Sequence, residues 1–134
     1  MLKKIEKIHW FKNPTDKTVL SSLSVEYGLA GKTPYPPVHL TKQVHGSVIL
    51  DVKNAQRAES DEERSQADGL YSQGSETVGV RTADCLPVLL TSEDTSIVMA
   101  VHAGWRGLAK GIVHEAIRIM QIKTSAAQIR VLFG

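Results

Sequence analysis

The C-terminal third of the chain carries the pattern that most constrains its fold. Residues 96–103 form a nearly unbroken apolar run, which is typical of a buried strand. Residues 129–133 have the composition of a further strand. Between them, five apolar side chains fall at offsets of 0, 3, 7, 11 and 14, on one face of an amphipathic helix: Trp105, Leu108, Ile112, Ala116 and Ile119. Strand, helix and strand in this order predict a βαβ-like unit near the C-terminus with a right-handed crossover.

The preceding sequence predicts several short strands separated by turns. Residues 38–44 and 48–52 alternate in polarity on either side of a turn at His45 and Gly46, which favours a hairpin. Residues 18–29 fit a helix or a strand equally well. Residues 54–66 are polar, and we expect a solvated loop or a short surface helix there. Four further segments have strand composition: 5–11, 67–71, 77–81 and 86–91.

Composition limits the class of protein. The length of 134 residues predicts a single domain covering 1–134. The formal net charge of +2, without a cluster of basic residues, argues against nucleic acid as a partner. The apolar runs are too short to span a bilayer, and the N-terminus lacks the apolar segment of a signal peptide. Cys85 is the only cysteine, so no intrachain disulfide forms, and a cytoplasmic location is expected.

Three residues with metal-binding side chains lie at or near the ends of predicted strands: His45, Cys85 and His102. Two imidazoles and one thiolate are a known ligand set for a zinc ion that keeps its fourth position open for water. Each residue also has a simpler interpretation, since a lone cysteine is usually a small buried hydrophobe and a histidine at a strand end is often only hydrogen-bonded. Spacing alone leaves the His/Cys/His metal site as one hypothesis among these.

Other polar residues have weaker support. Arg106 falls in the first turn of the predicted helix, where free N–H groups and its own charge favour an anion such as phosphate, although a surface charge explains it equally well. Arg81 is a second candidate partner for an anion or a carboxylate. His39 alternates in phase with His45 and is expected near it, whereas His114 falls off the apolar stripe and is expected to be solvated.

Four longer motifs occur in a specific order and carry a family resemblance: residues 42–46, 67–70, 80–90 and 100–107. Their sequences are KQVHG, ADGL, VRTADCLPVLL and AVHAGWRG. Over about residues 38–134 the chain resembles the laccase-domain proteins. This family is also described as multicopper polyphenol oxidoreductases, zinc-dependent purine nucleoside phosphorylases and peptidoglycan editing factors.

The resemblance implies a fold, a ligand set and an activity. It implies an α+β fold with a β-sandwich flanked by helices, and it matches His45, Cys85 and His102 to the family's metal ligands, with zinc as the ion. The activities attributed to the family are phosphorolysis of adenosine, inosine, guanosine and methylthioadenosine, together with adenosine deamination. A small-molecule nucleoside and phosphate are thus the expected partners, without nucleic acid or membrane, and Arg106 is our candidate for holding the phosphate.

Two departures from the family pattern affect these expectations. Nothing between Met1 and Pro37 matches the family's N-terminal Thr-Arg-x-Gly-Gly-Val-Ser-like segment. The family also continues into a Gly-Pro-Cys-Ile-Gly segment at the point where this sequence reads Leu132-Phe133-Gly134. We therefore expect a domain that is incomplete at its C-terminus, in a truncated form of the family fold.

Three alternative functions stay open at the level of sequence. A copper-dependent polyphenol oxidoreductase would use the same two histidines and cysteine with a weak axial methionine, but Met99 lies on the opposite strand face from His102. A cysteine hydrolase in peptidoglycan-precursor editing would use Cys85 as nucleophile and His102 or His45 as base. The third alternative is an inactive truncated remnant.

Overall fold

The computed structural model describes residues 7–12, 19–24 and 38–133 of the chain. Within these residues the fold is α+β, with strands arranged in two sheets and two α-helices. The element bounds are as follows: β1 (Lys7–Lys12), β2 (Val19–Ser24), β3 (Val38–His39), β4 (Ile49–Asp51), β5 (Gly69–Ser72), β6 (Thr77–Thr82), β7 (Leu86–Ser92), β8 (Val98–Ala103), α1 (Trp105–Ala109), α2 (Ile112–Lys123) and β9 (Ile129–Phe133).

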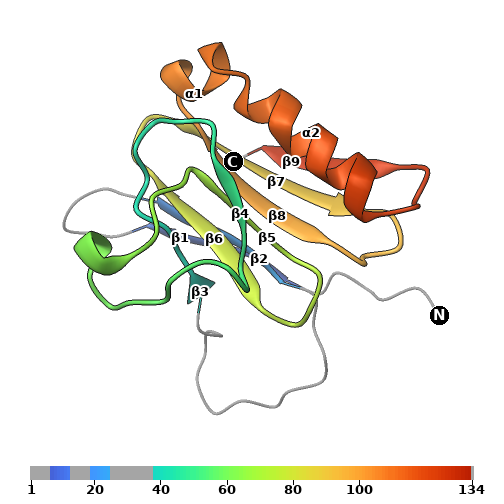
Figure 1. Cartoon of the computed structure of the whole chain (residues 1–134), viewed down its shortest axis with the longest axis horizontal. Coiled ribbons are helices and arrows are strands. Elements are labelled where there is room, and N and C mark those ends of the chain that lie inside the picture. Colours follow the sequence, from blue (N-terminus) through green and yellow to red (C-terminus); the bar gives the residue numbers. More distant parts are fainter. Residues whose placement is uncertain (1–6, 13–18, 25–37, 134) are drawn as a thin grey trace.

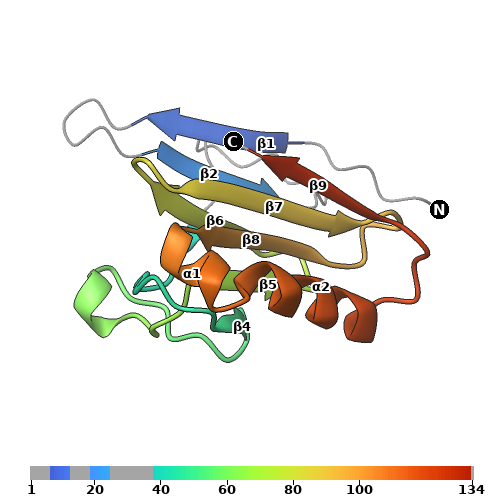
Figure 2. The same cartoon turned by 90° about the horizontal axis from the view of Figure 1, so that it is seen from above.

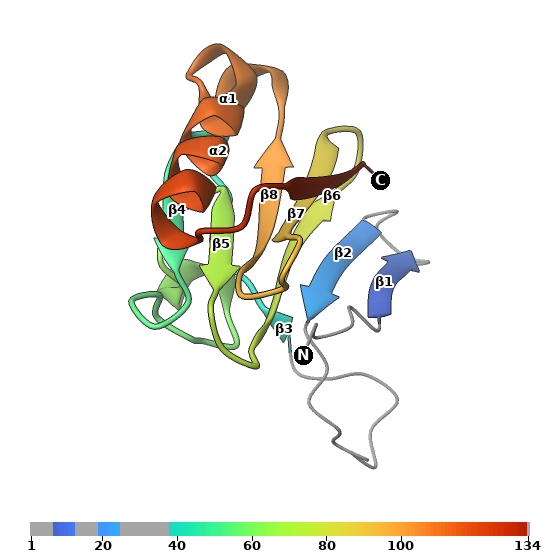
Figure 3. The same ribbon diagram turned by 90° about the vertical axis from the view of Figure 1, so that its right-hand side faces the viewer.

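The elements stack in three layers. One sheet has the strand order β1-β2-β6-β3, and the other has the order β4-β5-β8-β7-β9. The helices cover the face of the five-stranded sheet that points away from β1 and β2 (Figures 1, 2 and 3). This arrangement confirms the expected α+β class, with a β-sandwich flanked by helices.

Strand β8, in the middle of the five-stranded sheet, is buried on both faces, which explains its apolar run. On the face toward the other sheet, Val98 and Ala100 of β8 join an inter-sheet core with Leu70, Leu89 and their neighbours. On the opposite face, alternate β8 residues join a helix-side core whose members include Met99, Val101, Ala103, Ile112, Ala116, Ile119 and Met120. Since successive side chains of a strand point to opposite faces, both cores need apolar residues from one strand.

The predicted βαβ-like unit is present. Strands β8 and β9 each pair antiparallel with β7, so they run parallel to one another on either side of it. Helices α1 and α2 make the connection between them (Figure 2). Strand β9 has the predicted bounds, Ile129–Phe133.

The predicted helix is broken, and its first part does not bury its apolar residues. Helix α1 ends at Ala109 and α2 begins at Ile112, with Gly111 between them at a φ of 84°. The later stripe positions are buried in the helix-side core as predicted, but Trp105 and Leu108 are 73% and 48% exposed. A left-handed residue changes the direction of the chain, so residues on the two sides of Gly111 do not share one helix face even when their spacing is helical.

The predicted hairpin is wrong. Strand β3 pairs parallel with β6 in one sheet, and β4 pairs parallel with β5 in the other. The intervening segment makes one isolated parallel bridge, between Lys42 and Gln66, and is otherwise anchored by side chains. The Gln43 amide donates to the Arg81 carbonyl oxygen at 2.7 Å and accepts from the Arg81 backbone N at 2.8 Å, while the Thr41 hydroxyl donates to the Ala67 carbonyl oxygen at 2.7 Å. The polar alternation thus reflects side-chain anchors rather than strand pairing.

The remaining predictions are mostly confirmed where the structure describes the residues. The ambiguous segment 18–29 contains strand β2, and its residues 18 and 25–29 lie outside the described part, as do residues 5 and 6 of the predicted first strand. The polar segment 54–66 is a loop with a 3-10 turn at Asp61–Glu63. Among the described residues, we find no helix with the length and apolar character needed to cross a membrane.

Candidate metal centre

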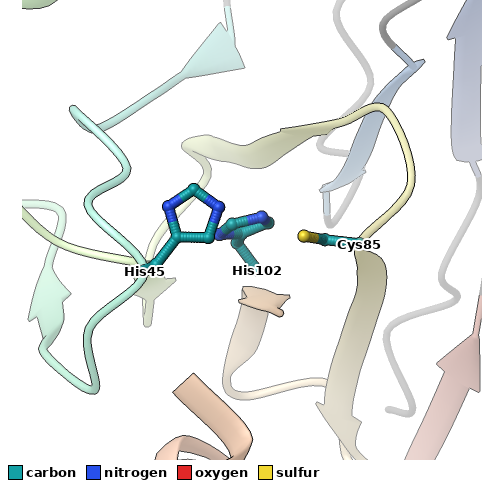
Figure 4. A group of neighbouring side chains, drawn as sticks. All are labelled: His45, Cys85 and His102. Atoms are coloured by element: carbon teal, nitrogen blue, oxygen red, sulfur yellow. The ribbon is translucent and has the colours of Figure 1, made fainter. Parts of the chain in front are cut away.

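The fold brings together the three residues with metal-binding side chains. One potential ligand atom from each of His45, Cys85 and His102 lies within 4.8 Å of the other two. Figure 4 shows the sulfur of Cys85 directed toward the His102 ring, with the His45 ring on the other side. The two imidazole rings meet edge to face, with centroids 4.9 Å apart. Three residues that span 57 positions of the sequence, from His45 to His102, therefore form one cluster of donors.

Strand pairing positions two of the donors. His102 is the penultimate residue of β8 and is 4% exposed. In the antiparallel pair, Pro87 of β7 lies opposite His102, and Leu86 lies opposite Ala103. Cys85 comes immediately before β7 and is half-buried, so the pairing carries its thiol to the same end of the sheet as the His102 ring.

A buried carboxylate positions the third donor. The backbone at His45 adopts a φ of 59°, a left-handed conformation that is unfavourable for a residue with a side chain. Asp68 accepts hydrogen bonds from the backbone N of Val44, His45 and Gly46 at 3.2, 2.9 and 2.8 Å. Successive N–H groups that converge on one anion form a nest, and these bonds hold the turn that presents His45.

The same carboxylate orients His102. Asp68 Oδ1 lies 2.8 Å from His102 Nδ1, and Asp68 is fully buried. An ionised carboxylate only accepts hydrogen bonds, so Nδ1 of His102 carries the proton and Nε2 is left as the electron-pair donor. A carboxylate behind a histidine ligand is a common way to fix its tautomer and increase its basicity.

Asp68 is ionised at neutral pH. Burial raises the pKa of its carboxyl group, but the hydrogen bonds from His102 and from the backbone of Gly46, Val44 and His45 outweigh that effect. The net result is a pKa below the ordinary 3.8. The cluster therefore has a fixed negative charge directly behind it.

The donor set fits zinc. Two imidazole nitrogens and one thiolate sulfur are borderline to soft donors that suit this ion. Zinc bonds of about 2.0–2.3 Å set tetrahedral donors roughly 3.3–3.7 Å apart, so side-chain shifts of about 1 Å bring these donors to binding distance. Three protein ligands leave one position for water or substrate, which distinguishes a catalytic from a structural zinc site.

The methionines of the described chain do not match a copper site with an axial thioether. Met99 and Met120 are fully buried in the helix-side core, on the face of β8 opposite to His102. The predicted face of Met99 is confirmed.

His39 and His114 are not members of the three-donor group. His39 belongs to β3 in the four-stranded sheet, where it lines a cavity of about 400 Å³ with Arg57 and Glu59. Burial and the charge of Arg57 lower the pKa of His39. His114 is exposed on α2, as predicted.

The two candidate anion-binding arginines have different surroundings. Arg106 is exposed in α1 and its guanidinium carbon lies 5.1 Å from the centroid of the Trp105 ring. Because α1 has only five residues, the helix dipole expected to assist it is small. Arg81 binds the carboxylate of Asp61, as expected for a carboxylate partner, and Asp61 also binds Arg64.

Sequence reasoning missed two residues that shape the site. Asp68 belongs to the ADGL motif, and an acid between Ala67 and Gly69 at the start of a buried strand is a signal, because acids are rarely fully buried unless paired. Gly104 is the second. A Cβ at this position would lie 3.0 Å from Cys85 Sγ and 3.3 Å from His45 Cδ2, so glycine allows the chain to pass close to the donors.

An α+β sandwich with two imidazoles and a thiolate at one end, and a carboxylate behind them, defines a class of protein that has the donors for a metal ion. Comparison with known proteins gives the family of the chain. A family model described as multi-copper polyphenol oxidoreductase laccase matches residues 25–134. The chain belongs to this family.

Curated relatives with similar sequences are named as phosphorylases. The chain is 44% identical over 89 residues to the purine nucleoside phosphorylase YfiH of Shigella flexneri, covering 66% of this chain and 34% of that protein. It is 34% identical over 108 residues to a purine nucleoside phosphorylase of Haemophilus influenzae, covering 80% and 40%. The chain thus spans between about a third and two-fifths of the length of these two relatives.

Solved structures share the fold. A Bacillus licheniformis protein titled hypothetical protein YfiH superposes with a TM-score of 0.63 at 30% identity, over 72% of this chain and 39% of that one. A Neisseria meningitidis protein also gives a TM-score of 0.63, at 25% identity, over 96% of this chain and 62% of the other.

Proposed function

We propose that this chain is a zinc-dependent purine nucleoside phosphorylase that also deaminates adenosine. The observation that carries the proposal is the convergence of His45, Cys85 and His102 within 4.8 Å, with Asp68 behind them. The names of the curated relatives support the phosphorylase class. The proposed substrates are adenosine, inosine, guanosine and methylthioadenosine, with inorganic phosphate as co-substrate.

The residues of the chain have distinct roles in this proposal. His45 Nδ1 or Nε2, the Cys85 thiolate and His102 Nε2 hold the ion. Zinc, when bound, supplies Lewis-acid polarisation and a source of hydroxide near neutral pH. Asp68 keeps the proton on His102 Nδ1 and holds the His45 turn, so the donors are arranged before the ion arrives.

Phosphorolysis requires a phosphate oxygen to attack the anomeric carbon of ribose. The bond between that carbon and the purine nitrogen breaks, the base leaves with the bonding electrons and takes up a proton, and ribose 1-phosphate is formed. Arg106, exposed two residues beyond Gly104, is the candidate for holding the phosphate by charge-assisted hydrogen bonds. The basis of this assignment is its position four residues after His102, in the segment that carries this donor.

Deamination at the same site has a different co-reactant. Water replaces the amino group at C6 of adenosine, the bond from C6 to nitrogen breaks, and ammonia and inosine are released. Both reactions need the nucleoside held beside the donors, which is why one site is proposed for both.

Metal analysis combined with product identification tests the proposal. Purified wild-type protein is expected to hold about one zinc per chain and to convert adenosine and phosphate into adenine, ribose 1-phosphate, inosine and ammonia. Cys85→Ala is expected to lose both zinc and products, whereas His114→Ala, which removes an exposed histidine, retains them. Wild-type protein that holds stoichiometric zinc and yields none of these products would show that the proposal is wrong.

A further inference from the structure

The exposed side of α1 has an unusual residue for a solvent-facing position. Trp105 is 73% exposed, more than any other large hydrophobic side chain of the described residues. It is the first residue of α1 and follows Gly104 directly. Tryptophan supplies a large, flat and rigid ring with a polar N–H, which suits it to contacts with planar ligands.

Trp105 lies at the edge of the donor cluster. A Cβ on Gly104 would be 3.0 Å from Cys85 Sγ. Since neighbouring Cα atoms are about 3.8 Å apart, the Trp105 Cα lies within about 9 Å of that sulfur. A group bound at the cluster and extending toward the start of α1 therefore comes close to residue 105.

Exposed apolar side chains adjoin each of the other two donor segments. Val44 precedes His45 and is 44% exposed, and Leu86 follows Cys85 and is 37% exposed. We use the name apolar rim for the three exposed residues that stand beside the donor segments in sequence: Val44, Leu86 and Trp105. A polar cluster bordered by such residues suits a ligand that has both a reactive polar part and a flat apolar part.

The Arg106 guanidinium lies over one face of the Trp105 indole and determines which face a ligand can contact. Arg106 places its guanidinium 5.1 Å from the centroid of the Trp105 ring, within the range of a cation–π contact. This contact occupies one face of the indole and restrains its orientation. The opposite face is then available for offset stacking with a heteroaromatic ring.

We propose that Trp105 is the stacking platform for the purine base of the substrate, with Arg106 restraining the indole on its other face. This inference rests on the proposed function for the choice of a purine nucleoside. Base recognition by stacking also explains why several purine nucleosides are proposed as substrates. Adenine, hypoxanthine and guanine all offer the same flat bicyclic face, so stacking tolerates differences in their ring substituents.

Binding measurements without phosphate test the platform separately from turnover. Equilibrium dialysis of inosine against the zinc-loaded chain is compared for wild type, Trp105→Leu and Trp105→Phe. We expect Trp105→Leu to weaken inosine binding by about 5- to 100-fold and Trp105→Phe to restore a large part of it, since stacking on an aromatic ring carries energy of this order. Binding of ribose alone is expected to be the same in all three proteins.

A matched control separates stacking from a general loss of apolar surface. Ile122 is 65% exposed on α2 and belongs neither to the donor cluster nor to the apolar rim. Ile122→Ala is expected to bind inosine as the wild type does. Zinc content is measured for every variant, and the platform predicts that it stays unchanged.

Each outcome bears on the proposal. Trp105→Leu with wild-type affinity for inosine, wild-type protein that does not bind inosine, or catechol bound through Trp105 in preference to inosine would each overturn it. Inosine binding that depends on Trp105, in a protein that releases no hypoxanthine when phosphate is added, would support the platform and refute the proposed phosphorylase function. Turnover that is indifferent to Trp105 would leave the function standing and refute the platform.

Discussion

Asp68 and His102 form a buried carboxylate–imidazole pair, with Asp68 Oδ1 2.8 Å from His102 Nδ1. The same oxygen accepts from the backbone N of His45 at 2.9 Å. One carboxylate therefore fixes the ring of one metal donor and the backbone of another, which couples two segments 57 positions apart in the chain.

Replacing Asp68 by asparagine is predicted to weaken zinc binding by about 10- to 100-fold. The amide has one acceptor oxygen in place of two, and its NH₂ group would face the N–H donors of Val44 and Gly46. Competition against a chromogenic chelator measures the affinity. Asp94→Asn, in the exposed turn at the other end of β7, is the control and should retain wild-type affinity; equal affinities for both variants would contradict the coupling.

A pair of glycine substitutions separates crowding of the donors from backbone strain. Gly104→Ala is predicted to weaken zinc binding by about tenfold, because the new methyl group meets Cys85 Sγ at 3.0 Å and His45 Cδ2 at 3.3 Å. Gly111→Ala meets no atom within 4 Å but must adopt a φ of 84°. It should lower the free energy of unfolding by about 1–2 kcal/mol and leave zinc affinity intact.

Chelator competition and urea unfolding, run on both glycine variants, check this prediction. The reverse pattern, with zinc affinity lost at Gly111 and retained at Gly104, would contradict the close approach of the chain to the donors.

Acid is predicted to remove the contribution of Asp68 to the stability of the metal-free fold. Its pKa is lowered in the folded chain relative to the ordinary 3.8. A lowered carboxyl pKa stabilises the fold fully above the unfolded-state value, and the contribution is lost as the pH falls through the folded-state value. The difference in unfolding free energy between wild type and Asp68→Asn should thus narrow as the pH falls below about 4.

Urea unfolding with a chelator present, at a series of pH values, measures this difference. A difference in unfolding free energy that does not narrow below about pH 4 would contradict the assignment of an ionised Asp68.

Copper is predicted to bind without supporting polyphenol oxidation. A multicopper cluster needs many histidines, and the chain has 5, of which two lie in the donor group. Met99 and Met120, the methionines of the described residues, are buried in the helix-side core. Oxygen uptake with catechol after copper loading should equal that of Cys85→Ala; uptake that depends on Cys85 would contradict this expectation.

The fold was predictable where periodicity is local. Strand β8 follows from composition because every residue of its apolar run is buried, and the apolar residues of 129–133 indicate strand β9, although this strand is largely exposed. The hairpin at residues 38–52 was not predictable from alternation. Gln43 and Thr41 use their side chains to bond distant backbone groups, and such contacts imitate the pattern of a strand without forming one.

The site was predictable as a set of residue types and not as a geometry. The residue types of His45, Cys85 and His102 indicate metal binding, but their convergence depends on the pairing of β7 with β8 and on the turn held by Asp68. Neither the pairing nor the turn can be predicted from the spacing of the three residues. The exposure of Trp105 could not be predicted for a related reason. The apolar spacing continues without interruption across Gly111, whereas the backbone there adopts a positive φ that ends the first helix.

X-ray absorption at the zinc edge of the loaded protein tests the central claim most directly. Coordination by His45, Cys85 and His102 predicts one sulfur neighbour at about 2.3 Å and two imidazole nitrogens at about 2.0–2.1 Å, with a light fourth ligand. The sulfur signal should vanish in Cys85→Ala. A zinc spectrum without sulfur in the wild-type protein, or one unchanged by Cys85→Ala, would contradict the claim that these three side chains form the metal site.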